Sequence, residues 1–383
     1  MTEKLNVPKK ANLNVYIVVN PSAGSYDEGT FNDLENTIKR TLQTYSLQKR
    51  FTELLDGNVI DSEKERSQQF NVITLKTQYA NHARAHFSQL ENVILKSVSL
   101  IIIVGGDGMV HEVVNGVSRN PNLSQYPFFA VCPMGTGNHL ADLVGTSSSD
   151  LFLKALRNYS DLVETQSITE NTSTSFGTKS IIPTEVVCLP TSNADRVKGE
   201  VIVPTLSINT IITGVPSNVN ERATKIAPYL PGVLSFLKYE LGTVFGMFDR
   251  DYLKIDLGRS SEIDNTNNNR NVIIDDVIGL FVQTTPSCGN GFVVDSRVTG
   301  NEEGLTYAYF KDVNTCKLLF ELSKEKAGYN SQDLVRRYNI DREITLHPYG
   351  DEYVYVTVDG QNEKITLPVT VRRSGVSLRF LTV

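Results

Sequence analysis

In the first third of the chain, short apolar runs alternate with longer segments whose apolar residues have helical spacing. Segments 28–46 and Ala80–Val93 predict helices. Four apolar runs around them predict strands: Val15–Val19, Asn71–Leu75, Leu100–Val104 and Pro127–Cys132. Strands that alternate with helices predict a parallel sheet covered on both faces. We therefore expect an α/β domain, Rossmann-like and in three layers, over residues 1–148.

The pattern changes after residue 148 to short β-type segments separated by Ser, Thr and Asn clusters. Many short strands of this kind predict an antiparallel β-sandwich domain over residues 149–383. One apolar segment, Leu230–Phe248, has helical spacing instead. The pattern alone favours an ordinary core helix there, and the functional alternative is a wall over a lipid-binding cavity.

Composition narrows the class of protein. A chain of 383 residues is long enough for two domains, and 37 basic against 43 acidic residues give a net charge of −6. This charge disfavours nucleic acid as the main partner. The four cysteines are far apart, without a CxxC pair, and indicate reduced thiols in a cytoplasmic protein. No apolar run approaches the roughly 20 residues that span a bilayer, so we expect any membrane contact to be peripheral.

The segment GGDGMVHEVVNG, residues 105–116, follows the third predicted strand directly. Val110, Val113 and Val114 lie on one face of the helix that it opens. Glycines let backbone N–H groups approach an anion, and a helix N-terminus adds partial positive charge, so the segment predicts a phosphate site. We expect Gly106 and Gly108 to use backbone angles closed to other residues and to hold Asp107 at the tip of the turn.

Two further loops with glycine follow predicted strands, NPSAGS at residues 20–25 and PMGTGN at residues 133–138. Loops at the carboxyl ends of parallel strands meet at one edge of the sheet, so we expect one cleft with an anionic ligand. The patterns GxxxxGK[ST] and GxGxxG are absent, which argues against P-loop and dinucleotide chemistry. Asp359-Gly360 on its own pattern predicts a two-residue hairpin turn.

With these motifs in their order, the chain resembles the diacylglycerol kinase/sphingosine kinase catalytic family. The resemblance covers VVNPSAGS, Thr77 with Asn81-His82-Ala83, GGDGMVHEVVNG and PMGTGN, and continues into INTIITGVPSNV, PGVLSF and VDGQ. Met109 and the HEVVNG segment are more similar to the sphingosine and ceramide kinase branch.

The resemblance implies roles for particular residues. Asp107 matches the general base, and Asp359 matches an acidic residue near the nucleotide and its Mg²⁺. The glycines around the transferred phosphoryl group are matched by Gly105, Gly106 and Gly108. The nucleotide-contacting positions are matched by Asn20, Pro21, Ser22, Thr77, Glu112, Gly135, Thr136 and Gly137.

The chain also departs from the family pattern. Gln361 stands where the family usually has Glu, and an amide lacks the negative charge that helps to hold Mg²⁺. Where sphingosine kinases place an acidic residue for the lipid amine, this chain has Asn220, with Glu221 one step away. The candidates for basic residues against the phosphates are Arg222, Lys225 and Lys238.

The resemblance implies an ATP- and Mg²⁺-dependent lipid kinase that phosphorylates a lipid hydroxyl, and we expect a sphingoid long-chain base as substrate. A diacylglycerol or ceramide kinase, a GGDG kinase with a soluble substrate, and a nucleotide- or lipid-binding homologue with weakened turnover stay open as alternatives. We expect a cytoplasmic protein with peripheral contact to an intracellular membrane. The sequence leaves open whether the chain forms a homodimer.

Overall fold

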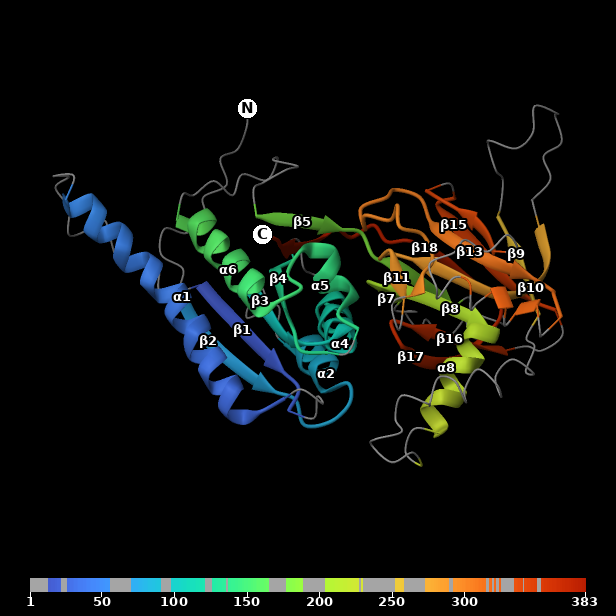
Figure 1. The fold of residues 1–383 in the computed structure, drawn as a ribbon, viewed down its shortest axis with the longest axis horizontal. Helices are drawn as coiled ribbons and strands as arrows, with labels where there is room; N and C mark the ends of the chain where they lie inside the picture. Colours follow the sequence, from blue (N-terminus) through green and yellow to red (C-terminus); the bar gives the residue numbers. More distant parts are fainter. Residues whose placement is uncertain are drawn as a thin grey trace. The chain divides into compact units, whose positions relative to one another are not determined.

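The structure is a computed structural model of the chain (Figure 1). It describes residues 13–21, 26–55, 70–90, 98–120, 126–135, 137–164, 177–188, 204–226, 229, 252–257, 273–288, 292–314, 317–318, 320–321, 324, 334–339, 341–349 and 353–383. The chain divides into two compact units. Unit 1 comprises residues 1–180 and 378–383, and unit 2 comprises residues 181–377.

Unit 1 is built on a six-stranded, mostly parallel sheet. Four of its neighbouring pairs are parallel: β1 with β2, β1 with β3, β3 with β4, and β4 with β19. The strands in spatial order are β2 (Phe70–Lys76), β1 (Leu13–Val19), β3 (Val98–Gly105), β4 (Phe128–Pro133), β19 (Leu378–Leu381) and β5 (Thr178–Ile181). The predicted parallel sheet is confirmed, and each of the four predicted strands is present within two residues of its expected bounds.

Helices cover both faces of this sheet, as Figure 1 shows. Alternation along β1 separates the faces, because Val15 and Ile17 pack with α1 and α6 while Tyr16 contacts Phe87 of α2. The second face also carries α4, which packs against α2. The helices are α1 (Glu28–Leu55), α2 (His82–Gln89), α4 (Asp107–Ser118), α5 (His139–Val144) and α6 (Ser149–Glu164). The three-layer α/β prediction is therefore confirmed.

The domain boundary differs from the predicted division between residues 148 and 149. Helix α6 belongs to unit 1, because Phe152 and Leu156 are buried in the core of that unit with β1 and β3. The last strand, β19, also returns to unit 1 and extends its sheet beside β4. Pairing between the last strand and a strand 251 positions earlier has no local sequence signal, so the pattern placed residues 375–383 in the second domain.

Unit 2 is an antiparallel domain whose main sheet has eleven strands. The path runs β17-β16-β8-β10-β9-β15-β18-β6-β7, with β13 on β10 and β14 on β13, and β11 pairs with β12 separately. Its strands are β6 (Thr184–Cys188), β7 (Thr205–Ser207), β8 (Thr210–Gly214), β9 (Leu253–Asp256), β10 (Ile273–Gln283), β11 (Ser287–Cys288), β12 (Phe292–Val293), β13 (Thr306–Lys311), β14 (Leu334–Arg337), β15 (Glu343–Pro348), β16 (Tyr353–Val358), β17 (Gln361–Thr366) and β18 (Val369–Arg373).

The long strand β10 joins the two halves of this sheet. Its first part pairs with β9 and its second part with β8, and its register shifts around Val277. Asp276 lies at this irregularity with φ 59°, and such a bulge bends a strand. One core cluster therefore takes Ile255 and Ile344 from one half together with Val356 and Leu280 from the other. The predicted antiparallel β domain is confirmed, as a single sheet that bends around its core.

A second core of unit 2 lies under helix α8 (Val215–Ile226), which contacts β8, β10 and β16. Val215 of this helix packs with Ile278, Phe281 and Phe310. The predicted helix Leu230–Phe248 lies outside the described residues. Among the helices that the structure describes, none is long and apolar enough to cross a membrane.

Candidate functional site

The carboxyl ends of the parallel strands in unit 1 bring the predicted loops together. Thr77, directly after β2, donates its backbone N–H to the carbonyl of Val19 at the end of β1 (2.9 Å). Met134, directly after β4, donates its N–H to the carbonyl of Gly105 at the end of β3 (3.1 Å). Backbone hydrogen bonds therefore join the end of β2 to that of β1 and the end of β4 to that of β3, and each pair is adjacent in the sheet.

The GGDG and PMGTGN loops touch through their backbones. A Cβ added to Gly135 would lie 2.3 Å from Cα of Gly106, and one added to Gly106 would lie 2.8 Å from Cα of Gly135. The expectation that Gly106 and Gly108 use backbone angles closed to other residues is wrong. Gly106 has φ −99°, and Gly108 lies inside α4. Gly106 is required because the neighbouring loop leaves no room for a side chain.

We predict that Gly135→Ala lowers the free energy of unfolding by about 1–3 kcal/mol, the usual cost of overpacking, because the two backbones must separate. Gly108→Ala is the matched control, since a Cβ at Gly108 meets nothing within 4 Å. We expect this control to be neutral or slightly stabilising, because alanine is the better helix former. Calorimetric melting of both variants measures the difference, and equal stability of Gly135→Ala and the wild type would contradict the close approach.

Asp107 is the first residue of α4, and its carboxylate connects the two loops. Oδ2 accepts the backbone N–H of His139 (3.1 Å), and Oδ1 accepts that of Leu140 (3.2 Å). Gly137 also passes close by, because a Cβ there would lie 3.0 Å from Oδ2 of Asp107. The carboxylate is thus fixed by the first turn of α5 at the edge where the strand ends meet, instead of standing free at the tip of a turn.

Sequence reasoning missed a second carboxyl group near Asp107. The pKa of Asp142 is raised by burial, while His139 opposes this and the charge of Asp107 adds to it. Asp142 is therefore a second acidic group close to Asp107 at this edge of the sheet. The sequence signal was present, since His139 and Asp142 follow PMGTGN directly in the first turn of α5.

Glu112 follows Asp107 by five residues in α4 and is 9% exposed. Its Oε1 accepts the backbone N–H of Asn81 (2.9 Å), whose φ of 65° ends the turn before α2. Its Oε2 is buried without a hydrogen-bond partner among the described residues. A buried carboxylate oxygen without a donor is costly, so it fits a ligand that brings a donor, such as a nucleoside hydroxyl or amino group.

The structure places most of the predicted nucleotide positions at this edge. Asn20 and Pro21 follow β1, and Thr77 is buried after β2. Ser22 and Thr136 lie outside the described residues. The predicted positions that the structure brings to the carboxyl edge of this sheet are Asn20, Pro21, Thr77, Gly105, Gly106, Asp107, Gly108, Glu112, Gly135 and Gly137.

Asp359 belongs to unit 2 and has a different environment. Its φ is 49°, and its side chain is 8% exposed. Oδ1 accepts the hydroxyl of Ser207 (2.7 Å) and the backbone N–H groups of Asn209 (2.9 Å) and Thr210 (3.1 Å). Oδ2 accepts the N–H of Ile208 (3.0 Å). The carboxylate therefore anchors the turn between β7 and β8.

These contacts do not fit the predicted Mg²⁺ role of Asp359. A carboxylate has about four lone-pair sites, and four donors already lie on this one. The described residues also contain no group of three His, Cys, Asp or Glu side chains that could hold a metal ion. The carboxylate of Asp359 is therefore assigned to the β7–β8 turn and not to a metal ion.

The residues considered for the lipid amine and the phosphates have partners in unit 2. Asn220 donates to Oδ1 of Asn362 (2.9 Å). Glu221 forms an ion pair with Lys225 and lies 3.9 Å from Nε of Arg222. Both described basic candidates thus face a carboxylate, and Lys238 lies outside the described residues.

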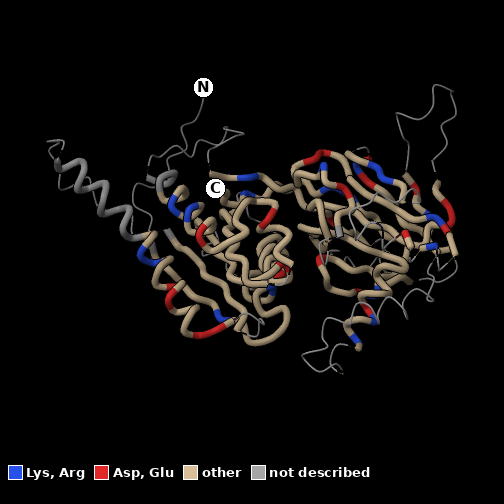
Figure 2. Tube along the Cα trace, in the orientation of Figure 1, with Lys and Arg blue, Asp and Glu red and all other residues tan. Residues whose placement is uncertain are grey.

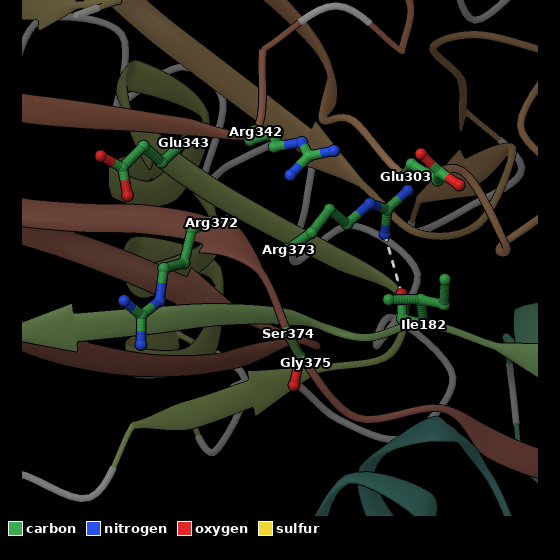
Figure 3. A pocket seen from close by; sticks show the side chains of 8 residues that line it. All are labelled: Ile182, Glu303, Arg342, Glu343, Arg372, Arg373, Ser374 and Gly375. Atoms are coloured by element: carbon green, nitrogen blue, oxygen red, sulfur yellow. Dashed lines mark hydrogen bonds between the residues drawn. The ribbon is translucent and has the colours of Figure 1, made fainter.

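A cavity of about 420 Å³ in unit 2 holds none of the predicted site residues. Its charged lining, shown in Figure 3, consists of Glu303, Arg342, Glu343, Arg372 and Arg373. Arg373 is paired with buried Glu302 (3.1 Å) and bonds to the carbonyl of Ile182 (2.9 Å), and Arg372 is paired with Glu185. Because the lining mixes both signs and its arginines hold structural contacts, we place the candidate site at the glycine loops of unit 1.

Comparison with known proteins agrees with this placement. Residues 47–167, which include GGDG and PMGTGN, match the family model described as the diacylglycerol kinase catalytic domain. No curated protein sequence matches the chain. Among solved structures, a diacylglycerol kinase from Bacillus anthracis has a TM-score of 0.55 at 14% identity, and two putative diacylglycerol kinases from this organism have 0.58 at 16% and 0.57 at 17%.

Each of these alignments covers 97% of this chain and 97% of the other. The likeness therefore extends over both units and is a likeness of fold. The chain therefore has the two-domain fold seen in these bacterial proteins, and its residues 47–167 are similar to the diacylglycerol kinase catalytic domain.

Proposed function

We propose that this protein transfers the γ-phosphoryl group of ATP to a hydroxyl group of a lipid, and that the lipid is a sphingoid long-chain base. The observation that carries the proposal is the backbone contact of Gly106 with Gly135, with Asp107 fixed between their loops. Exposed backbone N–H groups of such loops can take up the charge of a triphosphate. The match of this segment to a lipid kinase catalytic domain supports the same reaction.

In this mechanism Asp107 accepts the proton of the lipid hydroxyl while that oxygen attacks the γ-phosphorus in line. Each oxygen of Asp107 accepts one α5 N–H and keeps a second lone pair for the hydroxyl. The α5 N–H groups hold the carboxylate in position. Glu112 offers Oε2 to a donor on the nucleoside. Mg²⁺ bound through the nucleotide phosphates would supply positive charge in such a reaction.

The sphingoid assignment is supported by the sequence of α4, where Met109 and HEVVNG resemble the sphingosine and ceramide kinase branch. Glu221 lies one residue after the position that the family uses for the lipid amine, and a lipid amine there would have to replace Lys225 as its partner. Any attraction to an anionic membrane needs a local basic surface, because Figure 2 shows acidic and basic residues interspersed along the described parts of both units.

A lipid panel tests the substrate. We expect radiolabelled phosphate from ATP to enter a sphingoid base about tenfold or more faster than diacylglycerol or ceramide, because a site that binds an amine rejects analogues that lack it. NAD and sugar phosphates serve as soluble acceptors in the same assay. Faster labelling of diacylglycerol would overturn the sphingoid assignment and keep the lipid kinase, whereas labelling of a soluble acceptor alone would overturn both.

Gln361 favours a second candidate, a nucleotide- or lipid-binding homologue with weakened turnover. Gln361 begins β17 directly after the Asp359-Gly360 turn. Gln361 has an amide in place of a carboxylate, and the carboxylate of Asp359 already accepts protein donors such as the hydroxyl of Ser207. The variant Gln361→Glu decides between the candidates. A clear rise in turnover and in Mg²⁺ affinity would indicate a weakened active site, and an already active wild type without such a gain would exclude this candidate.

A further inference from the structure

An aromatic pair lies in the segment that follows β2, close in sequence to Thr77, and takes no part in the core of unit 1. The ring of Tyr79 is stacked on the imidazole of His82, with the ring centroids 4.6 Å apart and the planes inclined by 21°. Tyr79 is 61% exposed although it is stacked on this partner. One face of the tyrosine ring is covered by His82, so the open area is available to a ligand.

The local backbone fixes this pair before any ligand arrives. Nδ1 of His82 accepts the backbone N–H of Gln78 (3.1 Å), and the N–H of His82 donates to the carbonyl of Tyr79 (3.2 Å). The hydrogen bond at Nδ1 places the ring proton of neutral His82 on Nε2 and sets the ring orientation. A stacking surface that is held in place loses little side-chain entropy when a flat ligand binds.

The pair lies at the edge where the phosphate-binding loops meet. Tyr79 follows Thr77 by two residues, and Thr77 is tied to the end of β1. Asn81, between the two rings in sequence, donates its N–H to Glu112, whose Oε2 is buried and has no partner among the described residues. The backbone between the two rings is therefore tied to the carboxyl group whose other oxygen lacks a donor.

We infer that the Tyr79–His82 pair is the surface on which the adenine ring of the bound nucleotide stacks. The inference rests on the proposed function and names the part of the site that binds the base, which sequence motifs did not assign. A purine offers a π-face to the ring and donors on its amino group and ribose, and these donors suit the free oxygen of Glu112. Inorganic triphosphate has no aromatic ring and no such donors, so the Tyr79–His82 pair favours binding of a nucleotide over binding of other polyphosphates.

Isothermal titration of the full-length protein with ATP and with inorganic tripolyphosphate tests the inference. We expect Tyr79→Ala to weaken ATP binding about tenfold, the loss of one aromatic–base stack, and to leave tripolyphosphate binding within about twofold. Tyr79→Phe keeps the ring and should bind ATP like the wild type. Tyr229→Ala, which removes a tyrosine that is 86% exposed in unit 2, is the matched control and should change neither affinity.

The outcomes separate the inference from the proposed function. ATP binding by wild type and Tyr79→Ala with equal affinity would overturn the stacking role and leave the kinase proposal intact. Equal weakening of ATP and tripolyphosphate in Tyr79→Ala would also overturn it, since the loss would then come from the loop and not from the base. Absence of ATP binding in the wild type would contradict the proposed function itself.

Discussion

Replacing Asp107 with asparagine is expected to lower kcat for lipid phosphorylation by roughly 10²–10⁴-fold, the usual contribution of a positioned general base. The amide has no basic oxygen for the hydroxyl proton. It also presents one acceptor instead of two to the N–H groups of His139 and Leu140, so the α5 turn loses part of its anchor. A steady-state assay with saturating ATP and lipid measures the loss.

The double role of Asp107 calls for controls that separate chemistry from anchoring. Asp107→Ser keeps a good acceptor for helix N–H groups but no base, so it should melt near the wild-type temperature and still lack activity. Asp150→Asn is the matched control, because Asp150 is an exposed aspartate in the first turn of α6 in the same unit. It should leave kcat unchanged. Phosphate transfer by Asp107→Asn at the wild-type rate would show that Asp107 is not the base.

The parts of unit 1 that the sequence predicted well are those with strong local periodicity. β3 reads as a continuous apolar run because it is buried on both faces, and Val110, Val113 and Val114 of α4 are all buried as their spacing indicated. Helix ends were less accurate. The first helix extends to Leu55 instead of ending near residue 46, and α2 ends at Gln89, where Leu90 has an extended ψ of 131°.

Features that depend on contacts between residues far apart in the sequence could not be predicted from the local pattern. Nothing in the local pattern shows that Gly106 must be small because Gly135 lies against it, or that Asp107 accepts N–H groups 32 and 33 positions later. The same holds for β19, which completes the sheet of unit 1 from the end of the chain. The motif order predicted the candidate site, and the contacts between the motifs came from the structure.

Asp359 illustrates the limit of transferring a role by motif alone. The hairpin that its pattern predicted is present, with Asp359 and Gly360 between β16 and β17 and both at positive φ. The carboxylate, however, reaches the turn that precedes β8, which lies about 150 positions earlier. An acidic residue that matches a family motif can therefore stabilise the fold of the second unit, and its mutation then has to be assessed by stability as well as by activity.

Asp359→Ala is accordingly expected to destabilise unit 2 by about 3 kcal/mol or more. Each buried donor left without an acceptor costs about 1–3 kcal/mol, and the hydroxyl of Ser207 and the N–H groups of residues 208–210 would all lose theirs. Asp359→Asn keeps one acceptor oxygen and tolerates positive φ, so its loss should be smaller. Calorimetric melting of the two variants and the wild type measures the loss of stability.

The control for backbone strain is Asp276→Ala, because Asp276 has φ 59° but an exposed side chain. Its cost should be about 1 kcal/mol, the penalty for alanine in the left-handed region, and the excess at Asp359 measures the carboxylate contacts. A metal ligand would behave in the opposite way, since Asp359→Ala would then melt like Asp276→Ala and lose the Mg²⁺ dependence of ATP binding. That result would restore the metal role of Asp359, whereas a large loss of stability makes it the anchor of the β7–β8 turn.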